Sequence, residues 1–261
     1  KDELLAVLLV DVGKGNHEDV TFIVPHAPTS PHRFARLFTQ MSKRLLLLAT
    51  FALAAAAVFL LPGASAQPNT MKQVAEGVWF RHGDLMKEGH CNNVVIEMKE
   101  GLLVVDANFP SGARALLNDL KRFSSKPVKW VFDTHHHGDH AYANAVWTKQ
   151  GAETWAHANV LDEMKRYEPK RWQGENRADV KELNLPTAEP PQKTFTKSPY
   201  VIDDGTRRVE FRHFGWAHTR GDGSVYLPKE KILCTGDAAT NGPYNFTSGG
   251  NIGNWPKVMA A

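Results

Sequence analysis

Four metal-ligand side chains lie within six consecutive residues of this chain, and this cluster limits the folds that the chain can adopt. The run from Thr134 to His140 reads Thr-His-His-His-Gly-Asp-His and contains the pattern His-x-His-x-Asp-His. Neutral imidazole and carboxylate groups are the ligand types that Zn²⁺ and Fe²⁺ bind. A solvated histidine-rich loop is the alternative interpretation, but ligands at this density favour a metal site.

The residues before the cluster indicate where it lies in the fold. Residues 128–133, Val-Lys-Trp-Val-Phe-Asp, alternate in polarity and include β-branched and aromatic side chains, which predicts a strand. The ligands would then lie on the loop at the carboxyl end of that strand. This is the place where α/β sheets hold their binding and catalytic residues.

Hydrophobic patterning predicts a mixed succession of strands and helices around this loop. Ser111 is expected to cap a helix over 112–123, and the proline-rich segment 169–199 is expected to be a surface excursion near the mouth of the site. The remaining expected strands are 78–81, 93–98, 102–106, 153–156, 200–203, 207–213, 224–227 and 231–235, and the remaining helices are 140–149 and 158–167.

The amino-terminal part resembles a secretory leader. Met41-Ser42-Lys43-Arg44 is followed by an apolar run over 45–61 and then by Ala64-Ser65-Ala66, which are the three parts of a cleavable signal peptide. We therefore expect 1–40 to be upstream or mis-assigned sequence, 41–66 to be the signal peptide and 67–261 to be the mature domain. The protein would be periplasmic or secreted. A signal anchor with a genuine extension is the alternative.

Charge and cysteine content exclude some classes of function. Residues 1–66 hold six of the 31 basic and five of the 28 acidic residues, which leaves 25 against 23 in the expected mature domain. A nearly neutral domain without a basic stripe argues against nucleic-acid binding. Cys91 and Cys234 are too few for a disulfide framework and are expected either to pair or to be buried thiols. We expect a small-molecule substrate and no stable membrane association after signal cleavage.

Three motifs together resemble the metallo-β-lactamase-fold hydrolases. His-x-His-x-Asp-His at a strand end is similar to the first metal motif of that superfamily. Residues 215–222, Gly-Trp-Ala-His-Thr-Arg-Gly-Asp, resemble its second ligand motif, and residues 233–237, Leu-Cys-Thr-Gly-Asp, resemble the Thr-Gly-Asp that ends a later strand. The resemblance covers about 74–261. It implies a fold of the α/β (α+β) class, namely the αββα sandwich of that superfamily. The second half of the sandwich is expected to be incomplete in this chain.

The resemblance also implies a role for each motif residue. His135, His137 and His218 would bind a first metal ion, Asp139 and His140 a second, and Asp237 would bridge the two. Asp139 is also expected to orient a metal-bound hydroxide, and Asp106, which ends a strand, to support the metal loop. Relatives continue to a final ligand histidine that no residue here matches, so we expect the chain to be a fragment truncated at its C-terminus.

The bridging aspartate narrows the expected chemistry. β-Lactamases of this fold usually carry Cys or Ser at the position of Asp237, whereas the glyoxalase II-like branch, which includes thioesterases and lactonases, carries Asp. The resemblance therefore implies an exported hydrolase that cleaves an ester, thioester, lactone or related bond, with two zinc ions expected in the complete protein. β-Lactam hydrolysis, a mononuclear-iron persulfide dioxygenase and a non-enzymatic protein with a vestigial site are the alternatives.

Overall fold

Two β-sheets form the centre of the domain. The computed structural model describes residues 5–6, 67–240 and 245–261, and in the described residues the first sheet has the order β2-β3-β4-β5-β6-β7-β8 and the second the order β1-β12-β11-β10-β9. The strands of the first sheet are β2 (Met71–Ala75), β3 (Val78–Arg81), β4 (Asn93–Glu97), β5 (Leu102–Val105), β6 (Val128–Asp133), β7 (Glu153–His157) and β8 (Lys193–Phe195). Those of the second are β1 (Leu5–Ala6), β9 (Tyr200–Asp203), β10 (Arg208–Arg212), β11 (Ser224–Leu227) and β12 (Ile232–Cys234).

The two sheets pack face to face through a shared apolar core. Strand side chains alternate between faces with a period of two, so every second residue of β10, β11 and β12 points into this core. Phe132 of β6 joins the layers, because its ring centroid lies 4.4 Å from that of Phe211 in β10 and 6.1 Å from that of Phe195 in β8.

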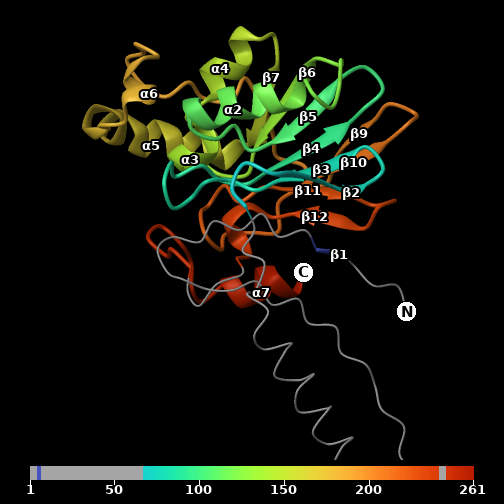
Figure 1. Cartoon of the computed structure of the whole chain (residues 1–261). Coiled ribbons are helices and arrows are strands. Elements are labelled where there is room, and N and C mark those ends of the chain that lie inside the picture. The colour runs from blue at the N-terminus through green and yellow to red at the C-terminus, as the bar shows by residue number, and fades with distance from the viewer. Residues whose placement is uncertain (1–4, 7–66, 241–244) are drawn as a thin grey trace, which may run out of the picture. The chain divides into compact units, whose positions relative to one another are not determined.

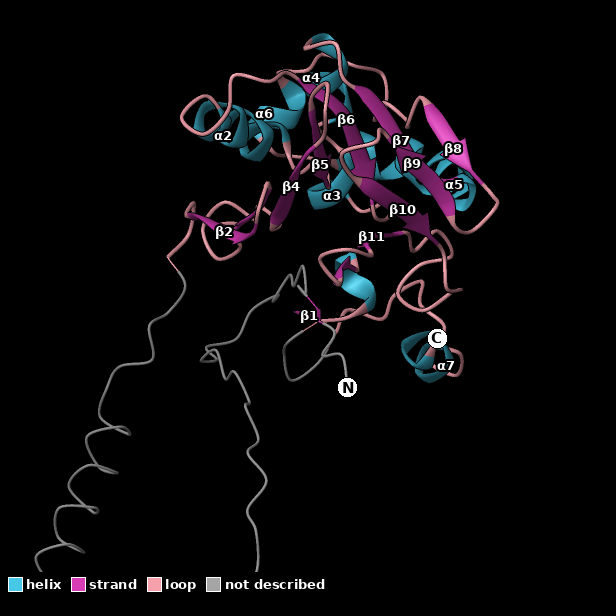
Figure 2. Cartoon of the chain, turned by 90° about the vertical axis from the view of Figure 1, so that its right-hand side faces the viewer, coloured by secondary structure: helices cyan, strands magenta, loops and turns pink. Residues whose placement is uncertain are grey.

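Helices cover both outer faces of the sandwich (Figure 1). A second apolar cluster joins α2 and α4 to the other face of the first sheet and includes Leu116 and Trp147, and Figure 2 shows the helices on that side. Beyond the second sheet, Val258 of α7 lines a pocket of about 470 Å³ with Tyr226 and Leu233. The helices are α2 (Pro110–Leu120), α3 (Gly138–Ala141), α4 (Asn144–Lys149), α5 (Ala158–Gly174), α6 (Ala178–Lys181) and α7 (Trp255–Ala260), with a 3₁₀ turn η1 (Gly236–Ala238).

This arrangement confirms the predicted mixed α/β sandwich and places the motif loops together. The strands β5, β6, β7 and β8 run parallel, so the loops that follow them leave the same edge of the sheet. The Thr134–His140 run follows β6, and η1 follows β12 in the second sheet. The predicted leader, 41–66, lies outside the described residues.

Three local expectations were wrong. The helix α2 begins at Pro110 with Phe109 as its N-cap, and Ser111 lies inside the first turn, where its N–H and hydroxyl both donate to Asp179. The expected helix over 140–149 is divided into α3 and α4. The expected excursion over 169–199 contains the end of α5, the short helix α6 and the edge strand β8.

Tertiary contacts explain why α5 continues past Pro169, although proline normally ends a helix by removing an N–H donor. Glu168 is buried and accepts a hydrogen bond from the Tyr142 hydroxyl at 2.5 Å. Trp172, one turn later, donates its indole N–H to the Leu185 carbonyl at 2.9 Å. These contacts on both sides of the proline hold the helix against the domain.

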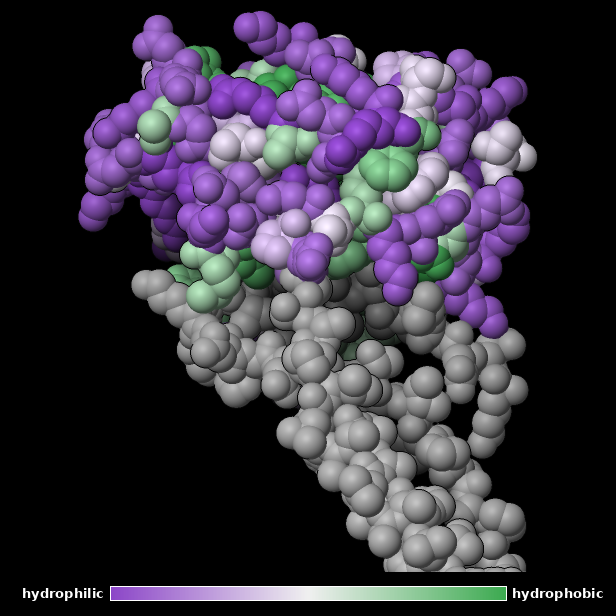
Figure 3. Space-filling model, in the orientation of Figure 1, coloured by the Kyte–Doolittle hydropathy of each residue, from purple (hydrophilic) through white to green (hydrophobic). Residues whose placement is uncertain are grey.

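The described surface is mostly polar. The face of the domain seen in Figure 3 is dominated by hydrophilic residues, with small apolar areas between them. Among the described residues, none of the helices has the length and apolar character needed to cross a membrane. The apolar run over 45–61 lies outside the residues to which this finding applies.

We predict that Phe132→Ala lowers the free energy of unfolding by about 3–5 kcal/mol, because it removes a fully buried ring between the two sheets. Urea denaturation followed by circular dichroism measures the change. Phe123→Ala is the matched control, since Phe123 is 47% exposed and its loss should change stability by about 0.5 kcal/mol or less. Equal losses in the two variants would contradict the shared core.

Candidate metal centre

Three histidine nitrogens converge at the edge of the sandwich. His135 and His137 lie on the loop after β6, and His218 lies on the loop between β10 and β11. The Nδ1 atom of His137 is 3.0 Å from Nε2 of His135 and 3.0 Å from Nε2 of His218. The three nitrogens therefore occupy the corners of a site that one metal ion could fill.

Asp237 lies between this cluster and a second group of ligands. Its Oδ2 atom is 3.6 Å from Nε2 of His218 and 4.0 Å from Nε2 of His135. Its Oδ1 atom is 3.4 Å from Nε2 of His140, and that same nitrogen is 3.3 Å from Oδ2 of Asp139. One oxygen of Asp237 thus faces His135 and His218, and the other faces His140. The metal-ligand roles of these residues stay predictions.

The electrostatics of the cluster suit a cation. Burial lowers the pKa of His135 and His137 well below the usual range, and neighbouring histidines lower it further. Burial and the nearby His140 also lower the pKa of His218 to about 4. These imidazoles are therefore neutral near pH 7, which is the form that binds metals.

The negative charge of the neighbouring Asp237 carboxylate is only partly balanced, by His140, whose Nε2 atom lies 3.4 Å from Oδ1. Burial raises the pKa of Asp237 to about 7, although His140 opposes the shift. Within the described part of the chain, Oδ1 of Asp237 is buried without a hydrogen-bond partner. Buried polar groups are normally satisfied, so neutral imidazoles and a buried carboxylate with open valences fit one or more divalent cations.

Asp106 supports the loop from below, at the position where the sequence predicted such a group. Its Oδ2 atom is 3.0 Å from Nδ1 of His140, and its Oδ1 atom accepts hydrogen bonds from the N–H and the hydroxyl of Thr134. Asp106 itself has a φ of +67°, which is uncommon for a residue with a side chain. The contact orients the His140 ring so that Nε2 faces Asp237.

Burial and neighbouring carboxylates shift the pKa of His140 in opposite directions. Burial alone would lower its pKa, but the carboxylates of Asp139 and Asp106 raise the pKa well above the usual range. A proton on this ring is therefore stabilised by Asp106 beside Nδ1 and by Asp139 beside Nε2, and only Asp139 of these two would share a cation with the ring. Metal binding at this position requires that the proton leaves.

Asp222 has a larger role than the sequence suggested, since the sequence slightly favoured a plain turn residue there. Its carboxylate accepts hydrogen bonds from the N–H groups of Ala217, His218 and Thr219 and from the Thr219 hydroxyl. Burial raises its pKa to about 6, although these hydrogen bonds favour the ionised form. Asp222 therefore folds the loop that presents His218.

Two further contacts surround the candidate ligands. The sequence led us to expect that His136 points away or supports the loop, whereas the position of Cys91 was not foreseen. His136, between two predicted ligands, stacks on Tyr167 of α5 with ring centroids 5.7 Å apart, so it faces away from the converging nitrogens. Cys91 lies close to Asp106 and His140, with the three potential ligand atoms within 4.8 Å of one another. Cys91 precedes β4 by two residues and is distant in sequence from both partners, so no local pattern could have indicated this.

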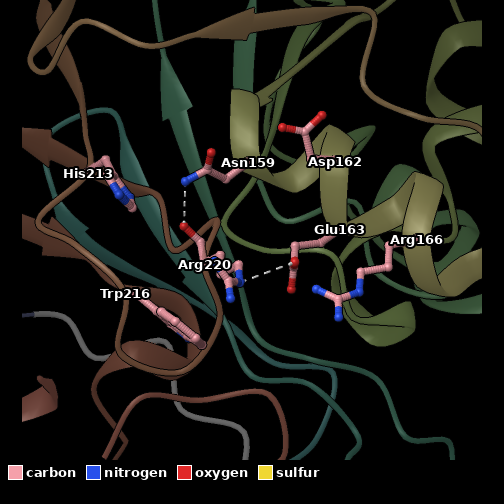
Figure 4. Close-up of a pocket in the computed structure, with 7 residues that line it drawn as sticks. All are labelled: Asn159, Asp162, Glu163, Arg166, His213, Trp216 and Arg220. Carbon is pink, nitrogen blue, oxygen red and sulfur yellow. Dashed lines mark hydrogen bonds and ion pairs between the residues drawn. The ribbon is translucent and has the colours of Figure 1, made fainter. Parts of the chain in front are cut away.

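A polar pocket lies beside the centre, between α5 and the loop that carries His218 (Figure 4). Its volume is about 500 Å³. The guanidinium of Arg220 lies 4.0 Å from the ring centroid of Trp216 and 3.9 Å from the Glu163 carboxylate, so this arginine spans the space between loop and helix. The pocket is lined by Asn159, Asp162, Glu163, Arg166, His213, Trp216 and Arg220, none of which is a predicted metal ligand.

Comparisons with known proteins agree with the fold. A family model described as the metallo-beta-lactamase superfamily matches residues 86–256. A metallo-beta-lactamase from Pontibacter korlensis is similar in structure, with a TM-score of 0.60 and 19% identity over 73% of this chain and 83% of that one. The DIM-1 metallo-beta-lactamase exposed to ceftazidime has a TM-score of 0.58 and 18% identity over 75% and 83%. At these identities the structures show a shared fold alone.

We predict that Asp222→Asn weakens metal binding by about 10–100-fold, the usual effect of removing a group that orients a ligand. The amide places an N–H₂ donor against backbone donors and so disturbs the His218 loop. Competition with a chromophoric chelator measures the affinity. Asp162→Asn, the same substitution at an exposed carboxylate on α5, should leave it unchanged; equal weakening in both variants would remove the role assigned to Asp222.

Proposed function

Because the chain belongs to the metallo-β-lactamase superfamily, we propose that it is a metal-dependent hydrolase of an ester, thioester, lactone or related bond. The observation that carries the proposal is the position of Asp237. One of its oxygens faces His135 and His218, and the other faces His140. A carboxylate placed in this way can hold two metal ions at once.

The first ion would be held by the three histidine nitrogens and Oδ2 of Asp237, and the second by Asp139, Nε2 of His140 and Oδ1 of Asp237. A metal at such a site lowers the pKa of bound water to about 7 and polarises a carbonyl or ester oxygen. We propose zinc for both positions, because neutral imidazole and carboxylate ligands suit it.

The chain's own residues would orient the reactants. The Asp139 side chain is 24% exposed, against 10% for Asp237 and 2% for His140, so it is the member of the second group nearest to solvent. We assign to its carboxylate the positioning of the attacking water and the acceptance of its proton. Asp106 and Asp222 act through the histidines that they orient and do not touch the substrate.

Asp237→Asn tests this proposal with little change in shape. We expect both bound metal and hydrolysis to fall, with activity reduced at least about hundredfold, because the neutral amide bridges two cations poorly. Elemental analysis per chain and assays with thioester, lactone, phosphodiester, sulfate ester and β-lactam substrates measure the two quantities. Asp203→Asn, the same substitution at an exposed carboxylate on β9, is the control and should behave like the unchanged protein.

The metal and substrate results also separate the alternatives. Two zinc ions per chain with turnover in the panel support the hydrolase. One iron ion with oxygen consumption on a persulfide would replace it with an oxygenase on the same scaffold. Bound zinc without any turnover would point to a non-enzymatic metal-binding protein, and turnover restricted to β-lactams would favour a β-lactamase despite Asp237.

We also propose that the protein is exported. The basis is the basic, apolar and Ala-Ser-Ala succession over 41–66, which lies outside the described residues. Expression of residues 41–261 in a bacterium should yield a periplasmic or secreted protein that begins at Gln67, as read by N-terminal sequencing. Ala66→Arg should block the cleavage, and a mature protein that retains residues 41–66 would contradict the assignment.

A further inference from the structure

An exposed aromatic ring lies at the rim of the candidate metal centre. Phe246 is 60% exposed, yet its ring centroid is only 5.7 Å from that of His137 and 6.3 Å from that of His218. The ring meets both imidazoles edge to face, at interplanar angles of 72° and 62°. One part of the ring therefore packs on two predicted ligands while the rest is open to solvent.

The segment that carries Phe246 is tied to the metal-ligand candidates. The backbone carbonyl of Phe246 accepts a hydrogen bond from Nδ1 of His218 at 2.9 Å, which leaves Nε2 of that ring to face the metal site. The preceding Asn245 donates its side-chain amide to the Asp237 carbonyl at 2.6 Å. Two neighbouring residues are thus bonded to two ligand candidates, so the ring has a defined place beside the centre.

Trp255 flanks His218 as well, but it has a different role. Its ring centroid is 5.9 Å from that of His218, and its indole N–H donates to the Ala238 carbonyl at 2.7 Å. This bond ties α7 to the turn that holds Asp237. Phe246 has no polar group on its side chain, and its exposed ring gains most from contact with an apolar group that arrives from solvent.

We propose that Phe246 is the apolar wall of the substrate site, so that the enzyme favours substrates with an apolar chain or ring attached to the scissile group. The inference rests on the proposed function, because it takes the convergence of His135, His137 and His218 as the place where the scissile group binds. A group held there lies next to the Phe246 ring, and its apolar part can cover the exposed ring. Short or anionic substituents gain little from this contact.

A binding experiment tests the proposal without turnover. Ethanethiol, butanethiol and hexanethiol present the same metal-binding sulfur on chains of increasing length, and calorimetric titration of the zinc-loaded full chain gives each dissociation constant. Each added methylene that becomes buried should tighten binding by up to about fourfold. The heat-capacity change should become more negative with chain length, as expected for apolar burial.

Two substitutions at one position isolate the ring. Phe246→Ala keeps the backbone carbonyl that orients His218, so zinc content should persist while the dependence on chain length is largely lost. Phe246→Leu should restore part of it. Phe123→Ala removes another partly exposed phenylalanine, which makes no ring contact with a metal-ligand candidate in the described part of the chain, and it should bind the thiols like the unchanged protein.

The outcomes separate this inference from the function on which it rests. Absence of bound metal in the unchanged protein would overturn the proposed function and this inference together. Bound zinc with equal affinity for all three thiols would overturn the role of Phe246 alone. A chain-length dependence that persists in Phe246→Ala would also overturn the role of Phe246. A dependence that is lost in Phe246→Ala and partly kept in Phe246→Leu supports that role. If Phe246→Ala loses its zinc, the test compares Phe246→Leu with the unchanged protein. A weaker chain-length dependence in Phe246→Leu then supports the role of the ring, and an equal dependence overturns it.

Discussion

The buried carboxylate of Asp237 is the constraint on which the arrangement of the site depends. An ionised carboxylate is costly to bury unless it is paired or bound to a metal, and Asp237 lies between two candidate ligands, His218 on one side and His140 on the other. The three imidazoles of the first group need a positive charge for a different reason. They are neutral, and their nitrogens face one another at 3.0 Å. Divalent cations would relieve both costs at once, which fits the metal centre proposed for these residues.

The sandwich makes this cluster possible by bringing together loops that are far apart in the chain. The loop after β6 supplies His135 to His140, the β10–β11 loop supplies His218, and η1 supplies Asp237. Two of these loops are stiffened by a carboxylate behind the candidate ligands, the loop after β6 by Asp106 and the β10–β11 loop by Asp222. The apolar core around Phe132 keeps the two sheets, and therefore the loops, in register.

Much of this was readable in the sequence, because the decisive signals are local. The strand over 128–133 and the ligand run after it are adjacent, so hydrophobic alternation and side-chain chemistry predicted both. The α/β sandwich followed from three motifs in order. Helix boundaries were less predictable: α5 passes through Pro169 because Glu168 and Trp172 make long-range hydrogen bonds, and such contacts have no signature in the surrounding residues.

The linear order of residues determined which chemical groups are available, namely a dense set of imidazoles and carboxylates at strand ends, because ligand type and spacing are properties of the chain. Only the tertiary structure decided how these groups are supported and what surrounds them. The hydrogen bonds of Asp222 to three backbone amides, the approach of Cys91 to His140 and the ring of Phe246 beside two histidines all depend on distances between segments, which are set by the packing of the whole domain.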